Sequence, residues 1–150
     1  MPTQAEQRAE IVREALSWLG TRYDHHQRIK GAGVDCLMLL AEVFERVGFV
    51  AHIEPGDYPH DWHLHRSEER YAQGLASYVR QLGDDERPLP GDIGLFRYGR
   101  TFSHAGIVVA DDLQLVHAYK GLGVVLTRLT EAPLCGRPVQ WWSAFQEAAA

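Results

Sequence analysis

The 150-residue sequence is poor in cysteine, in long apolar runs and in concentrated positive charge, and each shortage excludes a class of protein. Its two cysteines, Cys36 and Cys135, are far apart, which favours free thiols over a disulfide-stapled fold. No apolar run approaches the roughly 18 residues that a membrane-spanning helix needs. The polar N-terminus lacks the apolar segment of an export signal. A net charge of −5 without any basic block gives little support to a nucleic-acid partner.

The sequence does contain the composition of an ordinary globular protein, with a surplus of histidine. Hydrophobic residues make up 45% of the chain and aromatic residues 10%, which argues against disorder. The length is common for one hydrophobic core, so we expect a single domain over residues 1–150. The 8 histidines are the compositional feature that points to chemistry.

Helical periodicity is found in the first half of the chain, and strand-like patterns are found in the second half. Apolar residues at helical spacing predict three helices, over residues 5–19, 36–47 and 67–82. Short apolar runs between turn residues predict strands near 93–97, 105–110, 113–119, 124–129 and 137–145. Residues 20–34 and 51–66 are predicted to be loops. This order predicts an α+β fold in which N-terminal helices pack on a C-terminal antiparallel sheet.

Cys36 is a candidate nucleophile because of its place in the second predicted helix. Asp35 is a good N-cap, so Cys36 falls in the first turn, where unpaired N–H groups favour a thiolate and can hold an oxyanion. The alternative is that Cys36 is a small buried apolar residue, which is common for a free cysteine.

His104 and His117 gain a shared interpretation from the predicted hairpin between their strands. If Asp111 and Asp112 form a two-residue turn, Gly106 faces His117, and His104 lies on the same face as a diagonal neighbour. One histidine would then take a thiol proton while the other orients it. The alternatives are a polar residue at a strand end for His104 and a hydrogen-bonded core histidine for His117.

Five short motifs in order resemble the NlpC-type cysteine peptidases, a papain-like family that cuts the peptide stems of bacterial peptidoglycan. They are GTRY at 20–23, GVDC at 33–36, PGDI at 90–93, SHAGI at 103–107 and HAY at 117–119. The run YPHDW at 58–62, followed by SEE at 67–69, is similar to short single-domain members encoded in phage-tail and gene-transfer-agent clusters. The family's usual Ser-Gly after the cysteine is replaced by Leu37-Met38, which narrows the expected site.

The resemblance implies a role for each matching residue. Cys36 resembles the nucleophile, His104 the general base and His117 the polar residue that orients the base. Tyr23 matches a tyrosine that lines the site, Asp35 matches the acidic residue before the cysteine, and both are expected to bind substrate. No cofactor is implied.

The resemblance also implies partners and a place of action. The expected substrate is a peptidoglycan peptide, and phage tail proteins are expected partners. We expect a protein made in the bacterial cytoplasm without a signal peptide that acts at the cell wall as part of a virion tail. The alternatives are a structural tail component with little activity, or an amidase or acyltransferase on the same scaffold.

A histidine-rich loop precedes the third predicted helix and admits three interpretations, one of which is an exposed polar loop in which Trp62 packs down. His60, His63 and His65 could hold zinc, but their loose spacing implies no ligand geometry, so we expect no metal site. We favour a wall of the substrate groove, in which Trp62 stacks on the sugar or the stem peptide.

Overall fold

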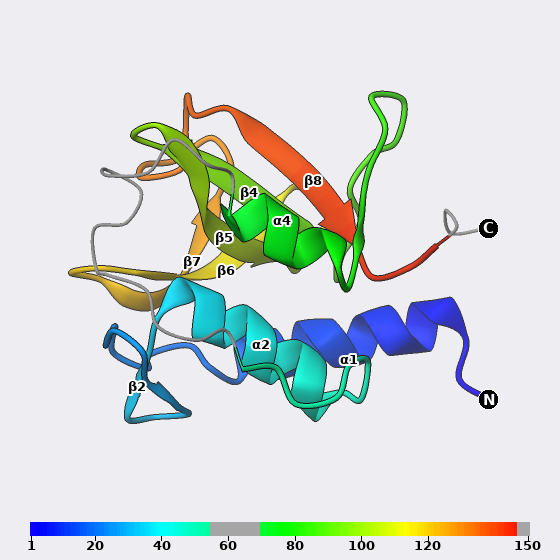
Figure 1. Cartoon of the computed structure of the whole chain (residues 1–150), viewed down its shortest axis with the longest axis horizontal. Coiled ribbons are helices and arrows are strands. Elements are labelled where there is room, and N and C mark those ends of the chain that lie inside the picture. The colour runs from blue at the N-terminus through cyan, green and yellow to red at the C-terminus, as the bar shows by residue number, and fades with distance from the viewer. Residues whose placement is uncertain (55–69, 147–150) are drawn as a thin grey trace.

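The computed structural model describes residues 1–54 and 70–146, which form helices packed on an antiparallel sheet (Figure 1). The helices are α1 (Gln4–Leu16), α2 (Cys36–Arg46) and α4 (Arg70–Ala76). The strands are β1 (Arg28–Ile29), β2 (Gly33–Val34), β3 (Arg80–Gln81), β4 (Ile93–Tyr98), β5 (Thr101–Val108), β6 (Gln114–Tyr119), β7 (Gly123–Arg128) and β8 (Val139–Ser143). The predicted α+β fold is confirmed.

The two long helices begin at side chains that cap their free N–H groups. Thr3 accepts from the backbone N–H of Glu6, and Glu6 returns the contact to the backbone of Thr3, which forms a capping box at α1. Asp35 caps α2 by accepting from the backbone N–H of Met38 at 2.9 Å. The first helix ends at Leu16, three residues before its predicted end, and Trp18 beyond it is fully buried.

The main sheet has the order β3-β8-β4-β5-β6-β7, and all of its neighbouring strands are antiparallel. In the β5–β6 hairpin Ile107 pairs with Val116 and Val108 pairs with Leu115. This is the register predicted from the Asp111-Asp112 turn. A Cβ atom added to Gly106 would lie 3.1 Å from the Cβ of His117, so these two positions are adjacent as expected.

Three predicted elements differ from the structure. The third helix ends at Ala76 instead of continuing to residue 82, and Arg80–Gln81 forms strand β3 against β8. The predicted loop 20–34 contains the hairpin of β1 and β2. The fifth strand starts at Thr101, so His104 lies inside the strand and not at its beginning.

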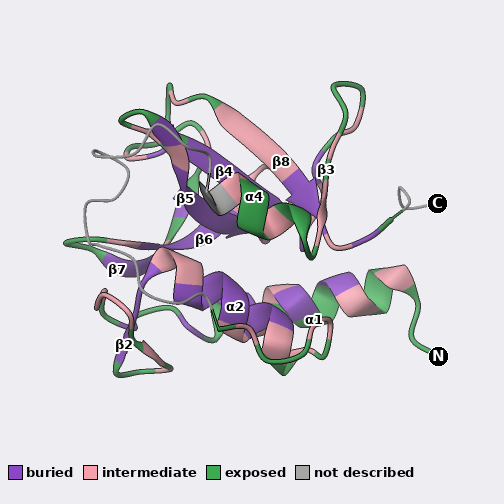
Figure 2. Ribbon diagram, viewed as in Figure 1, coloured by how far each residue is buried: buried purple, intermediate pink, exposed green. Residues whose placement is uncertain are grey.

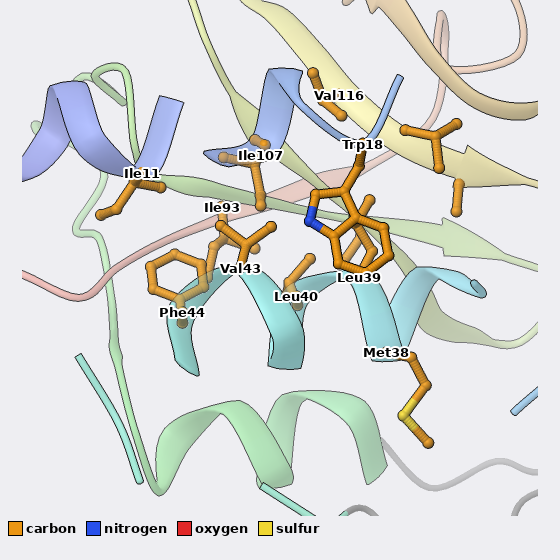
Figure 3. Packing of buried hydrophobic residues seen from close by; sticks show 14 of the residues in the cluster. Ile11, Trp18, Met38, Leu39, Leu40, Val43, Phe44, Ile93, Ile107 and Val116 are labelled. Atoms are coloured by element: carbon orange, nitrogen blue, oxygen red, sulfur yellow. The ribbon is translucent and has the colours of Figure 1, made fainter. Parts of the chain in front are cut away.

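The core lies between the helices and one face of the sheet (Figures 2 and 3). The faces of α1 and α2 that turn toward β5 and β6 carry the buried side chains, with Ile11, Leu39 and Val43 fully buried. Ala72 and Leu75 of α4 pack against the same core. Figure 3 shows Trp18 beside Leu39, where the segment after α1 meets α2. Within residues 1–54 and 70–146, no helix has the length and apolar character to cross a membrane.

Candidate active site

Cys36 occupies the first position of α2 and lies against strand β5. Its side chain is half-buried, and Sγ lies 3.9 Å from the carbonyl oxygen of Ser103. The backbone N–H of Ala105 is a hydrogen-bond donor to the sulfur. Ser103 and Ala105 are the residues on either side of His104. The sulfur of Cys36 therefore lies against strand β5 at the position of His104.

Burial raises the pKa of the Cys36 thiol to about 12, and the Asp35 carboxylate adds to the increase. The backbone N–H groups of Ala105, Leu37 and Cys36 act in the opposite direction, with a smaller effect. The N–H groups at the helix N-terminus lower the pKa of the thiol, as the sequence predicts, but burial outweighs them and the net change is upward. Cys36 is therefore a thiol at neutral pH, and a base must remove its proton before it can act as a nucleophile.

His104 and His117 form a hydrogen-bonded pair beside this thiol. Nε2 of His104 lies 2.8 Å from Nδ1 of His117, and the two rings meet edge to face with centroids 5.0 Å apart. This hydrogen bond uses Nε2 of His104, and Nδ1 is the other nitrogen of that ring. His104 is 7% exposed and His117 is fully buried.

The second nitrogen of His117 is also hydrogen-bonded. Nε2 of His117 lies 2.9 Å from Oγ1 of Thr127 on strand β7. Burial lowers the pKa of His117 to about 4, so this imidazole is neutral at physiological pH. Sequence reasoning missed Thr127, and the register of the β6–β7 hairpin is the signal that could have identified it.

Aromatic rings surround His104 and limit its movement. The rings of Tyr98 and Tyr119 lie edge-on to the imidazole at centroid distances of 5.3 and 5.4 Å, and Phe96 lies at 6.4 Å. Tyr98 is itself held by its hydroxyl, which donates to the carbonyl of Pro133 at 2.8 Å. Sequence reasoning gave none of these three a role.

Tyr23 reaches the site through a loop tied to both sheets. The loop is bonded to strand β7 where Val124 donates to the carbonyl of Thr21, and Tyr23 bridges to Val34 of β2. Burial, with Cys36 and Asp35 close by, raises the pKa of the Tyr23 phenol. Tyr23 therefore lies near the candidate nucleophile as a neutral hydroxyl.

Asp35 lies next to Cys36 but has little exposed surface. The side chain is 1% exposed, one oxygen caps α2, and the other accepts from the backbone N–H of His26 at 2.8 Å. This contact holds His26 at a φ of 66°, in the left-handed region. The ring of His25 approaches the same carboxylate, with Nδ1 at 3.8 Å from Oδ2. Asp35 thus orders the 24–27 loop and the start of α2 together.

The remaining predicted site residues lie outside the described part of the chain. These are Trp62 and the three histidines His60, His63 and His65. Among the residues that the structure describes, no group of three His, Cys, Asp or Glu side chains is placed to hold a metal ion. Both cysteines are thiols outside any disulfide, as predicted, and Cys135 is exposed.

Comparisons with solved structures agree with this fold. NlpC1 from Trichomonas vaginalis is 21% identical with a TM-score of 0.66, and the match covers 95% of this chain and 45% of that one. NlpC2 from the same organism is 20% identical with a TM-score of 0.68, over 95% and 48% of the two chains. The chain thus spans less than half the length of these two proteins.

A third solved structure corresponds to a single domain. The NlpC/p60 domain of the peptidoglycan hydrolase SagA is 18% identical with a TM-score of 0.59, over 89% of this chain and 96% of that domain. No curated protein matches the sequence. A model of the NlpC/P60 family matches residues 17–140. Because this match extends over most of the sequence, the chain belongs to the NlpC/P60 family.

Proposed function

We propose that this protein is a cysteine endopeptidase that hydrolyses the peptide stems of bacterial peptidoglycan. The observation that carries the proposal is the position of Cys36 against β5, beside the bonded pair of His104 and His117. Membership in the NlpC/P60 family supports the peptidase activity. The likeness to the SagA domain, whose name includes peptidoglycan hydrolase, supports the substrate class.

In the first half-reaction, Cys36 attacks the carbonyl carbon of a stem peptide bond. Nδ1 of His104 takes the thiol proton as the sulfur–carbon bond forms, and the carbonyl oxygen becomes an oxyanion. The backbone N–H groups of Cys36 and Leu37, at the N-terminus of α2, stabilise that oxyanion. The C–N bond then breaks, and His104 returns the proton to the leaving amine, which leaves a thioester on Cys36.

In the second half-reaction, water replaces the thiol. His104 takes a proton from water as the oxygen attacks the thioester carbonyl, and the sulfur leaves as the tetrahedral intermediate collapses. The product is a carboxylic acid, and the proton on His104 returns to Cys36. His117 stays neutral throughout because its lowered pKa, about 4, keeps the positive charge on His104.

The substrate contacts are assigned on different grounds. Tyr23 is assigned to the substrate side of the site because it lies near Cys36 and Asp35. Asp35 is assigned to positioning because it is buried and already bonded to two backbone N–H groups. Trp62 is proposed as a stacking residue only from its place in the sequence, between the nucleophile helix and the strands of the sheet.

Digestion of purified peptidoglycan sacculi, with mass spectrometry of the released fragments, tests the proposal. The wild-type protein should release peptides with new amino and carboxyl ends, whereas Cys36→Ala and His104→Ala should release none. Cys135→Ser is the matched control, because it removes the exposed thiol and should leave digestion unchanged. Digestion by Cys36→Ala at the wild-type rate, or no digestion by the wild type, would contradict the proposal.

The same products separate the related activities. An amidase would free whole stem peptides from the sugar, and an acyltransferase would join the acyl group to an added amine.

Association with a phage tail is the narrower part of the proposal. It rests on the similarity of residues 58–62 and 67–69 to phage-tail members of the family. These residues lie outside the part of the chain that the structure describes. Mass spectrometry of purified virions should find the protein in the tail fraction. A structural tail role without catalysis predicts that Cys36→Ala particles infect as well as wild-type particles.

A further inference from the structure

We propose that Thr127 is a positioning residue that stabilises the His117 tautomer protonated at Nε2, and so keeps Nδ1 of His104 unprotonated and able to receive the Cys36 proton. The biological role of this relay rests on the proposed peptidase function. Its test measures the thiol and the imidazoles directly, so it does not need a peptide substrate.

Strand pairing places Thr127 and His117 on the same face of the sheet. In the β6–β7 pair Thr127 is opposite Leu115, and His117 is opposite Val125. Residues two apart share a face of a strand, so Thr127 is the diagonal neighbour of His117. The hydroxyl and Nε2 of His117 are 2.9 Å apart, and the two residues are 7% and 0% exposed.

The chain of bonds allows two neutral proton arrangements. In the first, Nε2–H of His117 donates to Thr127, and Nε2–H of His104 donates to Nδ1 of His117. Nδ1 of His104 then carries a lone pair and can act as the base. In the second, every proton is reversed, so Nδ1 of His104 already carries a proton and cannot take one from Cys36.

The Thr127 hydroxyl can accept from a protonated Nε2 of His117 or donate to an unprotonated one, so it satisfies both arrangements, but only the first needs it as the acceptor of a buried N–H. A buried N–H without an acceptor is rarer in proteins than a buried acceptor without a donor, so the first arrangement depends on Thr127 more than the second does. If the hydroxyl is removed, the arrangement with an unprotonated Nε2 on His117 becomes the more stable one. Both histidines then change tautomer, and Nδ1 of His104 carries a proton and cannot act as the base.

No charged neighbour is needed for this selection, because His117 remains neutral. Burial lowers its pKa to about 4. The titratable groups whose rings lie beside it are His104 of β5 and Tyr119 of β6, at centroid distances of 5.0 and 6.0 Å. The choice between the two tautomers of a neutral ring is decided by its hydrogen-bond partners, and Thr127 is the partner at Nε2.

The test compares Thr127→Val with two reference variants in the full chain. Valine keeps the shape of threonine and removes the acceptor, while Thr127→Ser keeps the acceptor and removes a methyl group. Thr101→Val is the matched control. Thr101 is a fully buried threonine of β5 whose hydroxyl has no hydrogen-bond partner in the described residues.

Two measurements are made on each variant. Nitrogen-15 NMR of the histidine rings reports which nitrogen of His117 carries the proton. Peptide-resolved mass spectrometry reports the rate at which iodoacetamide alkylates Cys36 at neutral pH. We expect Nε2–H on His117 in the wild type, and in Thr127→Val we expect its loss with alkylation slowed by about tenfold or more. Thr127→Ser and Thr101→Val should stay within about twofold of the wild type.

Several results would overturn the proposal. One is a wild-type His117 protonated at Nδ1, and another is a Thr127→Val protein that alkylates at the wild-type rate. Equal slowing in Thr101→Val would show a general packing effect. If Thr127→Val does not fold, the wild-type NMR spectrum and the rate of Thr127→Ser decide the question. Failure to digest sacculi would refute the proposed peptidase function and leave this test unaffected.

Discussion

At the scale of single residues, the reactivity of Cys36 depends on a balance between burial and its neighbouring base. Burial raises the pKa of the thiol to about 12, so the thiol alone ionises only in strong alkali. In His104→Ala we expect Cys36 alkylation to be slow at pH 7 and to rise steadily with pH beyond 9. In the wild type we expect rapid alkylation already at neutral pH, because His104 accepts the proton. Alkylation rates by peptide-resolved mass spectrometry check this, with exposed Cys135 as the internal reference.

Equal alkylation profiles in the two proteins would show that His104 does not act on Cys36. A thiolate that is already formed would give the same result in both, with a plateau near neutral pH. One pair of pH profiles therefore distinguishes proton transfer to His104 from a thiolate that exists without it.

Gly106 is a residue at which one added methyl group should disturb His117. A Cβ there would lie 3.1 Å from the Cβ of His117 and 3.1 Å from the carbonyl oxygen of Val116, closer than most such contacts. We expect Gly106→Ala to lower the free energy of unfolding by about 1–3 kcal/mol and to slow Cys36 alkylation.

Gly74→Ala is the matched control for that substitution. Gly74 lies inside α4 with open space around it, so alanine should add up to about 1 kcal/mol to stability and leave alkylation unchanged. Urea unfolding and the alkylation assay check both variants. Wild-type behaviour of Gly106→Ala in both assays would show that the strand can move without displacing His117.

At the scale of elements, the parts that sequence could predict are those specified by neighbouring residues. The α2 helix follows from the Asp35 cap and the apolar spacing behind it, and the β5–β6 register follows from a two-residue turn. Thr127 required the register of a second hairpin, which no sharp turn in the sequence fixed. The raised pKa of Cys36 required knowledge of its burial, which is a property of two packed layers.

Strand β3 shows why the prediction of a helix continuing to residue 82 failed. The apolar spacing through residues 71–82 favours a helix, but Arg80 pairs with Ser143 of β8 and its side chain makes further contacts there. Its Nε donates to the carbonyl of Phe145 at 2.7 Å, and its guanidinium donates to both oxygens of Glu86 at 2.8 and 2.9 Å. The contact with Phe145 joins distant parts of the chain, and contacts of this kind override local propensity.

The Arg80–Glu86 pair should therefore hold β3 against β8. Arg80 lowers the pKa of Glu86 to about 2 from its ordinary 4.5. A carboxyl whose pKa is lowered in the folded state stabilises the fold at pH values above 4.5. Its contribution is lost as the pH falls from about 4.5 to about 2. We expect Glu86→Gln at pH 6 to speed exchange of the Leu82 amide, which donates to Trp141 at 2.8 Å.

Hydrogen-exchange mass spectrometry or NMR checks this, and the wild type at pH 3 should show part of the same effect. Exchange in α2 serves as the control and should not change. If Leu82 exchanges at the same rate in both proteins, β3 is held by its backbone pairing alone.

At the scale of the whole molecule, the candidate site depends on two layers that must not slide. Cys36 belongs to the helix layer, whereas His104, His117 and Thr127 belong to the sheet (Figure 1). A buried ion pair joins the layers away from the site, between Arg8 of α1 and Asp92 at the start of β4. The guanidinium donates to the carboxylate at 2.9 Å and to the carbonyl of Pro90 at 3.0 Å.

Breaking this ion pair should be costly because it would leave one buried charge without its partner. The Arg8 and Asp92 side chains are 10% and 2% exposed, and Asp92 also accepts from the backbone N–H of Leu89. We expect Asp92→Ala to lower the free energy of unfolding by about 3–5 kcal/mol in urea. The double variant Arg8→Ala with Asp92→Ala should lose less than the sum of the two single losses, because the second substitution removes the unpaired charge.

Asp112→Ala, at an exposed contact with Arg128 of 3.9 Å, is the control and should cost less than about 1 kcal/mol. Additive losses at Arg8 and Asp92 would mean that the two side chains act separately and do not clamp the helix layer to the sheet.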